Sequence, residues 1–137
     1  MAENRFLFEI TTPFRKVYSG EATSVIAPGF EGYFGVLARH APMVASIRIG
    51  EIKVKTDSEE LYFATSGGFA EVLPDRVTIL AESAEAANEI DVQRAEAAKE
   101  RALKRLAEGK KVWDVDRAQA ALARALNRLK VASRVGS

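Results

Sequence analysis

The chain has 137 residues, of which 47% are hydrophobic, and its formal net charge is +1. This length and composition predict a packed core in one domain, or in one domain with a small second module. The sequence contains no cysteine, which excludes a disulfide framework, a thiolate metal site and a cysteine nucleophile. No run approaches the ~20 apolar residues of a membrane span, so we expect a soluble protein without direct membrane insertion.

The charges are unevenly distributed along the chain. Residues 1–90 carry 8 Lys and Arg against 13 Asp and Glu, a balance of −5. Residues 91–137 carry 12 Lys and Arg against 6 Asp and Glu, a balance of +6. A change of this size at one point predicts two modules with different partners.

The sequence of the first ~82 residues predicts short strands separated by turns. Phe6, Phe8 and Ile10 alternate with other residues at period two, as expected for one buried face of a strand. The predicted strands are residues 5–10, 17–18, 23–27, 50–55, 61–65, 69–73 and 76–81, with turns at Pro13, Ser19-Gly20, Pro28-Gly29, Gly67-Gly68 and Pro74-Asp75. Residues 1–86 are therefore expected to form an antiparallel β-sandwich.

The periodicity becomes helical after Ala81. The segment from Ile90 to Glu108 is rich in Ala, Glu, Lys and Arg without Gly or Pro, and a second helix is predicted from Asp114 or Asp116 to about Ser133. The expected apolar stripes are Val92, Ala95, Ala102, Leu103 and Leu106 in the first helix, and Ala118, Leu122, Leu126 and Leu129 in the second. Residues 87–137 should form an antiparallel helix-turn-helix hairpin, in which the many alanines permit close approach.

The sequence contains no recognisable catalytic constellation. His40 is the only histidine, and no partner stands at a spacing typical of nucleophilic or acid–base catalysis. Gly109-Lys110 is not part of a phosphate-binding loop, because Lys104 stands where the first glycine should be. We therefore expect no catalytic residue, no metal site and no enzymatic activity.

The basic second module does not have the pattern of a nucleic-acid-binding protein. Its one aromatic residue, Trp113, lies in the connection between the helices and is not interleaved with arginines. A basic stripe that faces an acidic protein surface fits the composition better. Arg117, Arg124 and Arg128, spaced by seven and four, form such a stripe nearly opposite the expected apolar face.

Four segments of the sequence carry motifs that are informative together. The first is Glu-Gly-Tyr-Phe-Gly-Val-Leu at residues 31–37, followed by His-Ala-Pro at residues 40–42. The others are residues 66–72 with 77–81, residues 90–102, and the last helix at residues 117–129. Taken together, and in this order over nearly the whole chain, these segments resemble the epsilon subunit family of the F-type ATP synthases.

The resemblance implies a non-catalytic central-stalk (rotor) subunit of a proton-translocating ATP synthase, peripheral on the cytoplasmic face of the bacterial inner membrane. The sandwich would bind the gamma subunit and the ring of c subunits, with Glu31, Gly32 and His40 in the loop that contacts the ring. Alternatively, Glu31 is only solvated and the glycines only shape a turn. The sequence departs from the family at Ala38-Arg39, where Pro-Gly or a similar pair often precedes the histidine.

The resemblance also implies that the hairpin regulates the enzyme. In an extended state, Arg117, Arg124 and Arg128 would contact acidic segments of the alpha and beta subunits and slow ATP hydrolysis. The alternative for each arginine is an ordinary solvated helix face. Such a hairpin is a two-state device, free of the motor when folded and obstructive when extended.

Residues 90–95, Ile-Asp-Val-Gln-Arg-Ala, resemble the motif through which some members of the family bind ATP as a regulatory ligand. The implied ATP-binding residues are Glu85, Ile90, Asp91, Arg94, Ala95 and Arg101, and no cofactor is required. Arg94 and Arg101 are seven apart and share a helix face, so they could bind phosphates as a pair. Alternatively, Asp91 only caps the helix and Arg94 pairs in solvent. The alternative function is a free-standing ATP-binding sensor that uses the same hairpin.

Overall fold

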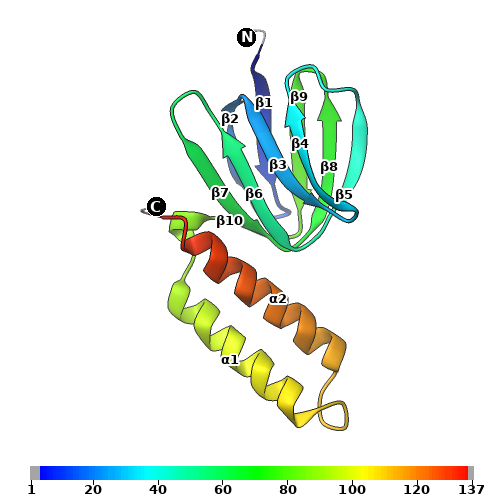
Figure 1. The fold of residues 1–137 in the computed structure, drawn as a ribbon, viewed down its shortest axis with the longest axis vertical. Coiled ribbons are helices and arrows are strands. Elements are labelled where there is room, and N and C mark those ends of the chain that lie inside the picture. The colour runs from blue at the N-terminus through cyan, green and yellow to red at the C-terminus, as the bar shows by residue number, and fades with distance from the viewer. Residues whose placement is uncertain (1–3, 136–137) are drawn as a thin grey trace. The chain divides into compact units, whose positions relative to one another are not determined.

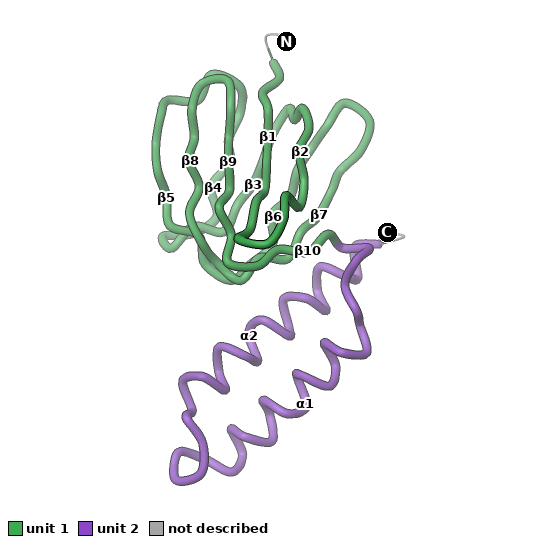
Figure 2. Tube along the Cα trace, turned by 180° about the vertical axis from the view of Figure 1, so that it is seen from behind, with its two compact units in different colours: residues 1–86 green, residues 87–137 purple. Residues whose placement is uncertain are grey.

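The computed structural model describes residues 4–135, and the chain divides into two compact units, residues 1–86 and 87–137 (Figure 2). The described part of unit 1 consists of ten strands (Figure 1). They are β1 (Phe6–Thr11), β2 (Lys16–Ala22), β3 (Ser24–Gly29), β4 (Gly32–Leu37), β5 (Met43–Ile47), β6 (Gly50–Lys55), β7 (Glu60–Thr65), β8 (Gly68–Leu73), β9 (Arg76–Ala81) and β10 (Ala84–Ala86).

The strands form one folded sheet in the order β10-β7-β6-β3-β5-β8-β9-β1-β2, with β4 paired to β3. The two halves of this order meet at a single pair, Gly29 of β3 and Ile47 of β5. Neighbouring strands are antiparallel except for β1 and β9, which are parallel. The predicted β-sandwich is therefore confirmed, with one parallel pair that the turn spacing does not reveal.

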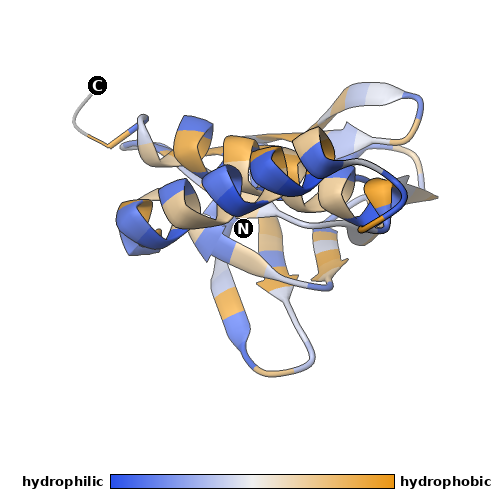
Figure 3. Cartoon of the chain, turned by 90° about the horizontal axis from the view of Figure 1, so that it is seen from below, coloured by the Kyte–Doolittle hydropathy of each residue, from blue (hydrophilic) through white to orange (hydrophobic). Residues whose placement is uncertain are grey.

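Alternation of apolar and polar residues builds the core of the sandwich. Strands β1 and β9 bury every second side chain, and hydrophobic and hydrophilic bands alternate along several strands in Figure 3. Phe8 and Ile10 of β1 are fully buried, as are Ile52 and Val54 of β6 on the other half of the sheet. Burial of such side chains contributes about 1.5–3 kcal/mol each, and it fixes the register of every strand.

Three strands and two predicted turns differ from the sequence-based expectations. Pro28 and Gly29 lie inside β3, where they pair with Tyr33 and Gly32, so no turn occurs there. Ser19 and Gly20 lie inside β2, where Gly20 pairs with Phe8, so the predicted turn is wrong. Strands β4, β5 and β10 were not predicted from the sequence. Strand β4 contains two glycines, β5 follows a proline, and β10 has only three residues, so none shows a clear alternation of apolar and polar residues. The segment after Glu31, expected as one loop, contains strand β4.

Unit 2 consists of a short 3-10 turn, η1 (Ala87–Glu89), and two helices, α1 (Val92–Glu108) and α2 (Val115–Ala132). Asp91 caps α1, since its carboxylate accepts a hydrogen bond from the Arg94 amide at 3.0 Å. Asp114 caps α2 in the same way through the Arg117 amide at 3.2 Å. The predicted helical hairpin is confirmed, and Asp114, not Asp116, is the cap of the second helix.

Alanines form the contact between the two helices. Ala95 and Ala102, seven residues apart in α1, are buried, and so are Ala118 and Ala125, seven apart in α2. The expected stripes are wrong in part, because Val92, Leu103 and Leu126 are between 42% and 47% exposed. Small side chains let two helices approach closely, and the larger residues are then displaced to the flanks of the contact. No helix within residues 4–135 combines the length and the hydropathy that crossing a bilayer requires.

Candidate functional site

Glu31 lies in the tight turn that joins β3 to β4, and its side chain is exposed. Gly32 follows with φ of 126°, a backbone conformation that favours glycine, and a Cβ there would meet no atom within 4 Å. The glycine is therefore required by backbone conformation and not by lack of space. Phe30, next to them, is 72% exposed, and these residues line a groove of about 490 Å³ together with residues 43–46 of β5.

His40 does not lie beside Glu31. The two residues flank opposite ends of β4, which at ~3.3 Å per residue separates them by about 20 Å. His40 is half-buried, and its Nδ1 is 2.7 Å from the carbonyl oxygen of Ala41. The expectation of a single loop that presents both side chains is therefore wrong, because residues 32–37 between them form β4 and pair with β3.

An exposed apolar cluster covers part of the outer face of β5, β8 and β9. Phe69 and Leu80 are direct cross-strand partners and are 56% and 54% exposed. Val44, 71% exposed, lies on the neighbouring strand β5 opposite Glu71, two pairs along the ladder from Phe69 and on the same face. We call Val44, Phe69 and Leu80 the outer patch. Contiguous exposed apolar residues of this kind mark surfaces that bind other proteins.

The outer patch was not predicted, although the sequence contains a signal for it. Phe69 shares its side of β8 with Glu71, because residues two apart in a strand face the same way. A large aromatic residue on the side of a charged residue indicates an exposed side chain. The same test applied to β9 places Leu80 with Thr78 on the outer face.

The structure divides the six residues expected to bind ATP between the two units. Glu85 is half-buried in β10 of unit 1 and pairs with Ala64 of β7. Ile90 and Ala95 in unit 2 are buried, so their side chains serve packing. Asp91 caps α1 through its Oδ1, and its role in ATP binding stays a prediction.

Arg94 and Arg101 are both exposed on α1, and they are seven residues apart, which is about two helical turns. Neither guanidinium forms an ion pair with another residue of the described part of the chain. A pair of arginines on one helix face presents donors that suit phosphate oxygens. Their role in ATP binding stays a prediction.

Arg117, Arg124 and Arg128 share one side of α2, as their spacing predicted, but they flank the buried alanines and are not opposite them. Arg117 is exposed, whereas Arg124 and Arg128 are half-buried. Arg117 and Arg124 also line a groove of about 420 Å³ near the connection between the helices. The arrangement gathers positive charge at this end of the hairpin.

Trp113 orders the connection between the helices. The guanidinium of Arg105 lies 4.5 Å from the centroid of its ring, and its Nε1 donates a hydrogen bond to Glu108 at 3.1 Å. Both partners belong to the last turn of α1, so the indole holds the connection against that helix. No cluster of three His, Cys, Asp or Glu suited to a metal ion occurs in residues 4–135.

Each of the two units matches the model of a known protein family. The family model described as ATP synthase, Delta/Epsilon chain, beta-sandwich domain matches residues 5–87. The model described as ATP synthase, Delta/Epsilon chain, long alpha-helix domain matches residues 88–133. The sandwich followed by the hairpin therefore defines the class of the ATP synthase delta/epsilon chains.

Proteins with similar sequences show to which family within this class the chain belongs. The "ATP synthase epsilon chain" of Desulfosudis oleivorans is 53% identical over 110 residues, covering 80% of this chain and 82% of that protein. The proteins of the same name from Syntrophobacter fumaroxidans and Brevibacillus brevis are 52% and 48% identical, covering 80% and 77% of this chain and 81% and 80% of their own lengths. The chain belongs to the ATP synthase epsilon chain family.

Solved structures show the same fold. A chain in the mitochondrial ATP synthase of Euglena gracilis superposes with a TM-score of 0.79 at 22% identity, covering 90% of this chain and 79% of that one. A chain in the central stalk and c-ring of the Tetrahymena thermophila mitochondrial enzyme gives a TM-score of 0.54 at 12% identity, covering 96% of both chains.

Proposed function

We propose that this protein is a non-catalytic central-stalk subunit of an F-type ATP synthase, which couples the catalytic sector to the c-ring and inhibits ATP hydrolysis through its hairpin. The observation that carries the proposal is the match of both units, in order, to the two domains of ATP synthase delta/epsilon chains. Relatives about 50% identical bear the name epsilon chain. The protein would then be peripheral on the cytoplasmic face of the bacterial inner membrane.

The sandwich is the part that binds the rotor. The outer patch of Val44, Phe69 and Leu80 supplies an apolar surface suited to the gamma subunit. Glu31 and Gly32, beside exposed Phe30, supply a mixed polar and apolar turn suited to the loops of the c-ring. His40 lies at the other end of β4, so a ring contact through His40 would be separate from the Glu31 contact.

Stable association with gamma tests the assignment as a rotor subunit. The full chain should co-purify with co-expressed gamma subunit as a complex that survives size-exclusion chromatography. A free-standing ATP sensor would not form this complex. The absence of a complex, with both proteins folded as shown by circular dichroism, would contradict the proposal.

The hairpin is the inhibitory part. When it extends, Arg117, Arg124 and Arg128 would meet acidic segments of the alpha and beta subunits, where several charge-assisted contacts add up. The arginines share one side of α2, so a single acidic surface can engage all three. Inhibition then depends on the population of the extended state, and a ligand changes it only by its different affinity for the two states.

ATP is proposed as a regulatory ligand of the hairpin, bound through Arg94 and Arg101 with Asp91 contributing. The exposed arginine pair on α1 supports this proposal. Titration of the full chain with MgATP to millimolar concentration should change Trp113 fluorescence and raise the thermal midpoint. The variant R94Q/R101Q should abolish both changes, whereas the control K104Q should not. Unchanged signals in the unmodified chain would exclude a functional ATP site.

A further inference from the structure

We propose that the sandwich carries a site for a phosphate group at the end where β4 and β6 finish, held by Arg39 and Lys55. An open hollow of about 450 Å³ lies there, lined by Asn4, Thr23, Ser24, Leu37, Ala38, Arg39 and Lys55. Two of these residues are cationic, three are neutral and polar, and none of the described lining residues carries a carboxylate. The site is separate from the Glu31 turn and from the hairpin.

The sheet register places the lining residues side by side. Ser24 of β3 pairs with Leu37 of β4 on one side and with Lys55 of β6 on the other. The next residues along the three strands, Val25, Val36 and Val54, are buried, so this row faces outward. Thr23, just before β3, holds the end of β6 in place, since its amide and hydroxyl both donate to the carbonyl oxygen of Lys55, at 2.8 and 3.1 Å.

Arg39 is held in the hollow by an unusual backbone conformation. Its φ is 63°, and it is the only residue other than glycine within residues 4–135 that has a positive φ. Its amide donates to the carbonyl oxygen of Pro74 in the β8–β9 turn at 2.7 Å. A left-handed backbone disfavours residues with a Cβ, so glycine or asparagine would fit more easily here. A long cation at such a position points to a function for its guanidinium.

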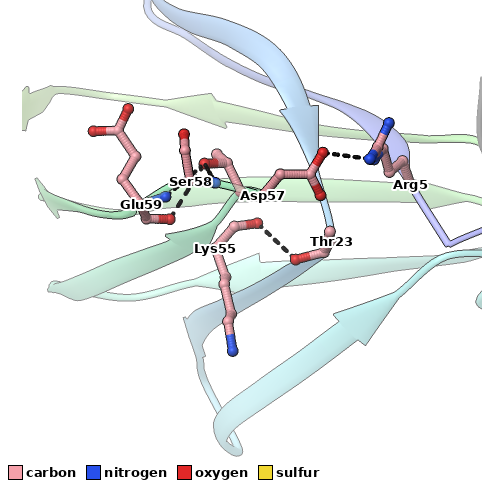
Figure 4. Close-up of polar contacts among 7 residues, drawn as sticks. Arg5, Thr23, Lys55, Asp57, Ser58 and Glu59 are labelled. Atoms are coloured by element: carbon pink, nitrogen blue, oxygen red, sulfur yellow. Dashed lines mark hydrogen bonds and ion pairs between the residues drawn. The ribbon is translucent and has the colours of Figure 1, made fainter.

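The neighbouring acidic residues are engaged elsewhere. Asp57, in the turn after β6, forms an ion pair with Arg5, and the Lys55 side chain extends away from that pair in Figure 4. Glu60, the cross-strand partner of Lys55, accepts a hydrogen bond from Tyr62 and pairs with Lys53 at 3.4 Å, and Lys55 attracts it electrostatically without forming an ion pair. Neither Arg39 nor Lys55 forms an ion pair with any residue that the structure describes.

These groups suit a phosphate more than a carboxylate or an apolar ligand. A guanidinium and an ammonium can bind two different oxygens of one phosphate, and the Ser24 hydroxyl and the Asn4 amide can donate to a third. Leu37, 66% exposed, gives the rim an apolar part. The phosphate could belong to free inorganic phosphate or to a phospholipid headgroup, and the experiment separates these sources.

Amide chemical shifts of the full chain would be followed by NMR during titration with inorganic phosphate. Cosedimentation with phosphatidylcholine vesicles would be measured in parallel, with and without phosphatidylglycerol. Shifts at Ser24, residues 37–39 and Lys55 with phosphate support binding of the free ion. Binding only to vesicles that contain phosphatidylglycerol, with the same residues affected, supports a lipid headgroup. The absence of both effects overturns the proposal.

Variants of Arg39 and Lys55 test whether phosphate binds at this hollow. Arg39→Asn removes the charge but tolerates a positive φ, and Lys55→Gln removes the other charge at an exposed position. Each should weaken binding about tenfold, as expected for loss of a charged hydrogen-bond donor. The control Lys53→Gln makes the same charge change two residues away on the same face of β6, outside the hollow. An equal loss in the control would show unspecific attraction and overturn the proposal.

Discussion

Phe69 of β8 and Leu80 of β9 lie directly opposite each other on the outer face of the sandwich, with more than half of each side chain exposed. The double variant F69S/L80S removes most of the outer patch without touching the core. We expect its affinity for the gamma subunit to fall tenfold or more, because central apolar residues dominate such interfaces. Isothermal titration calorimetry measures this directly.

The control for the outer patch is F14S. Phe14 is 91% exposed in the bend after β1, so its replacement loses similar apolar area at a different place. Its affinity for gamma should equal that of the unmodified chain. Equal losses in both variants would mean that the outer patch is not the contact surface.

Gly68→Ala should be strongly destabilising. Gly68 has φ of 145°, and a Cβ there would collide with the carbonyl oxygen of Leu80 and lie 2.9 Å from the Cα of Ala81. Gly32→Ala is the matched case, since only its φ of 126° is unfavourable. Urea denaturation should show a loss of about 1–2 kcal/mol for Gly32→Ala and a clearly larger loss, about 3 kcal/mol or more, for Gly68→Ala. Equal losses would contradict the close approach of β9.

The capping role of Asp91 can be separated from any contact with ATP. Asp91→Ala removes the hydrogen bond to the Arg94 amide and should reduce hairpin stability by about 1 kcal/mol. Asp91→Ser keeps a capping oxygen without the carboxylate, so stability should be nearly preserved. Thermal unfolding followed at 222 nm distinguishes the two variants. If the serine variant loses as much stability as the alanine variant, the cap is not the source of the stability.

Ala125→Leu should force the two helices apart. Ala125 is fully buried in the contact between α1 and α2, and adding a larger side chain to a close-packed contact costs about 1–3 kcal/mol. Ala123 is exposed on the same helix, so Ala123→Leu is the control and should be nearly neutral. A lowered midpoint for helix unfolding only in Ala125→Leu would confirm the alanine contact. Equal midpoints in both variants would contradict it.

The pKa of Glu60 lies below its ordinary value of 4.5, mainly because the Tyr62 hydroxyl donates to the carboxylate at 2.8 Å and also because Lys53 lies nearby. A lowered pKa means that this contribution to stability is present above the ordinary value and is lost as the pH falls through the lowered one. Tyr62→Phe should raise the Glu60 pKa, as measured by NMR titration of its side-chain carboxyl. An unchanged pKa would contradict the hydrogen bond.

Strong periodic patterns allowed much of the fold to be predicted from sequence. The alternation of Phe6, Phe8 and Ile10 and the composition of residues 90–108 indicated β1 and α1 correctly. The pattern of β4 was obscured by Gly32 and Gly35, which are too small to show which face is buried. As a result, Glu31 and His40 were expected in one loop although they flank opposite ends of a strand.

The predicted stripes of the helices were wrong in part, for a different physical reason. Hydrophobic periodicity gives most weight to large residues, so it placed Leu103 and Leu126 in the contact between the helices. The structure buries the predicted Ala95 and Ala102 and also Ala125, which the stripe did not include, because small side chains allow close packing. Tertiary packing, which the periodicity of a single helix does not encode, decided which residues were buried.

We propose that the hairpin inhibits a rotary enzyme to which the sandwich attaches. ATP hydrolysis by an alpha–beta–gamma complex would be measured with the full chain and with residues 1–88. We expect the full chain to slow hydrolysis, and the truncated chain to bind gamma without slowing it. Equal rates with the two forms, both bound to gamma, would contradict the inhibitory role of the hairpin.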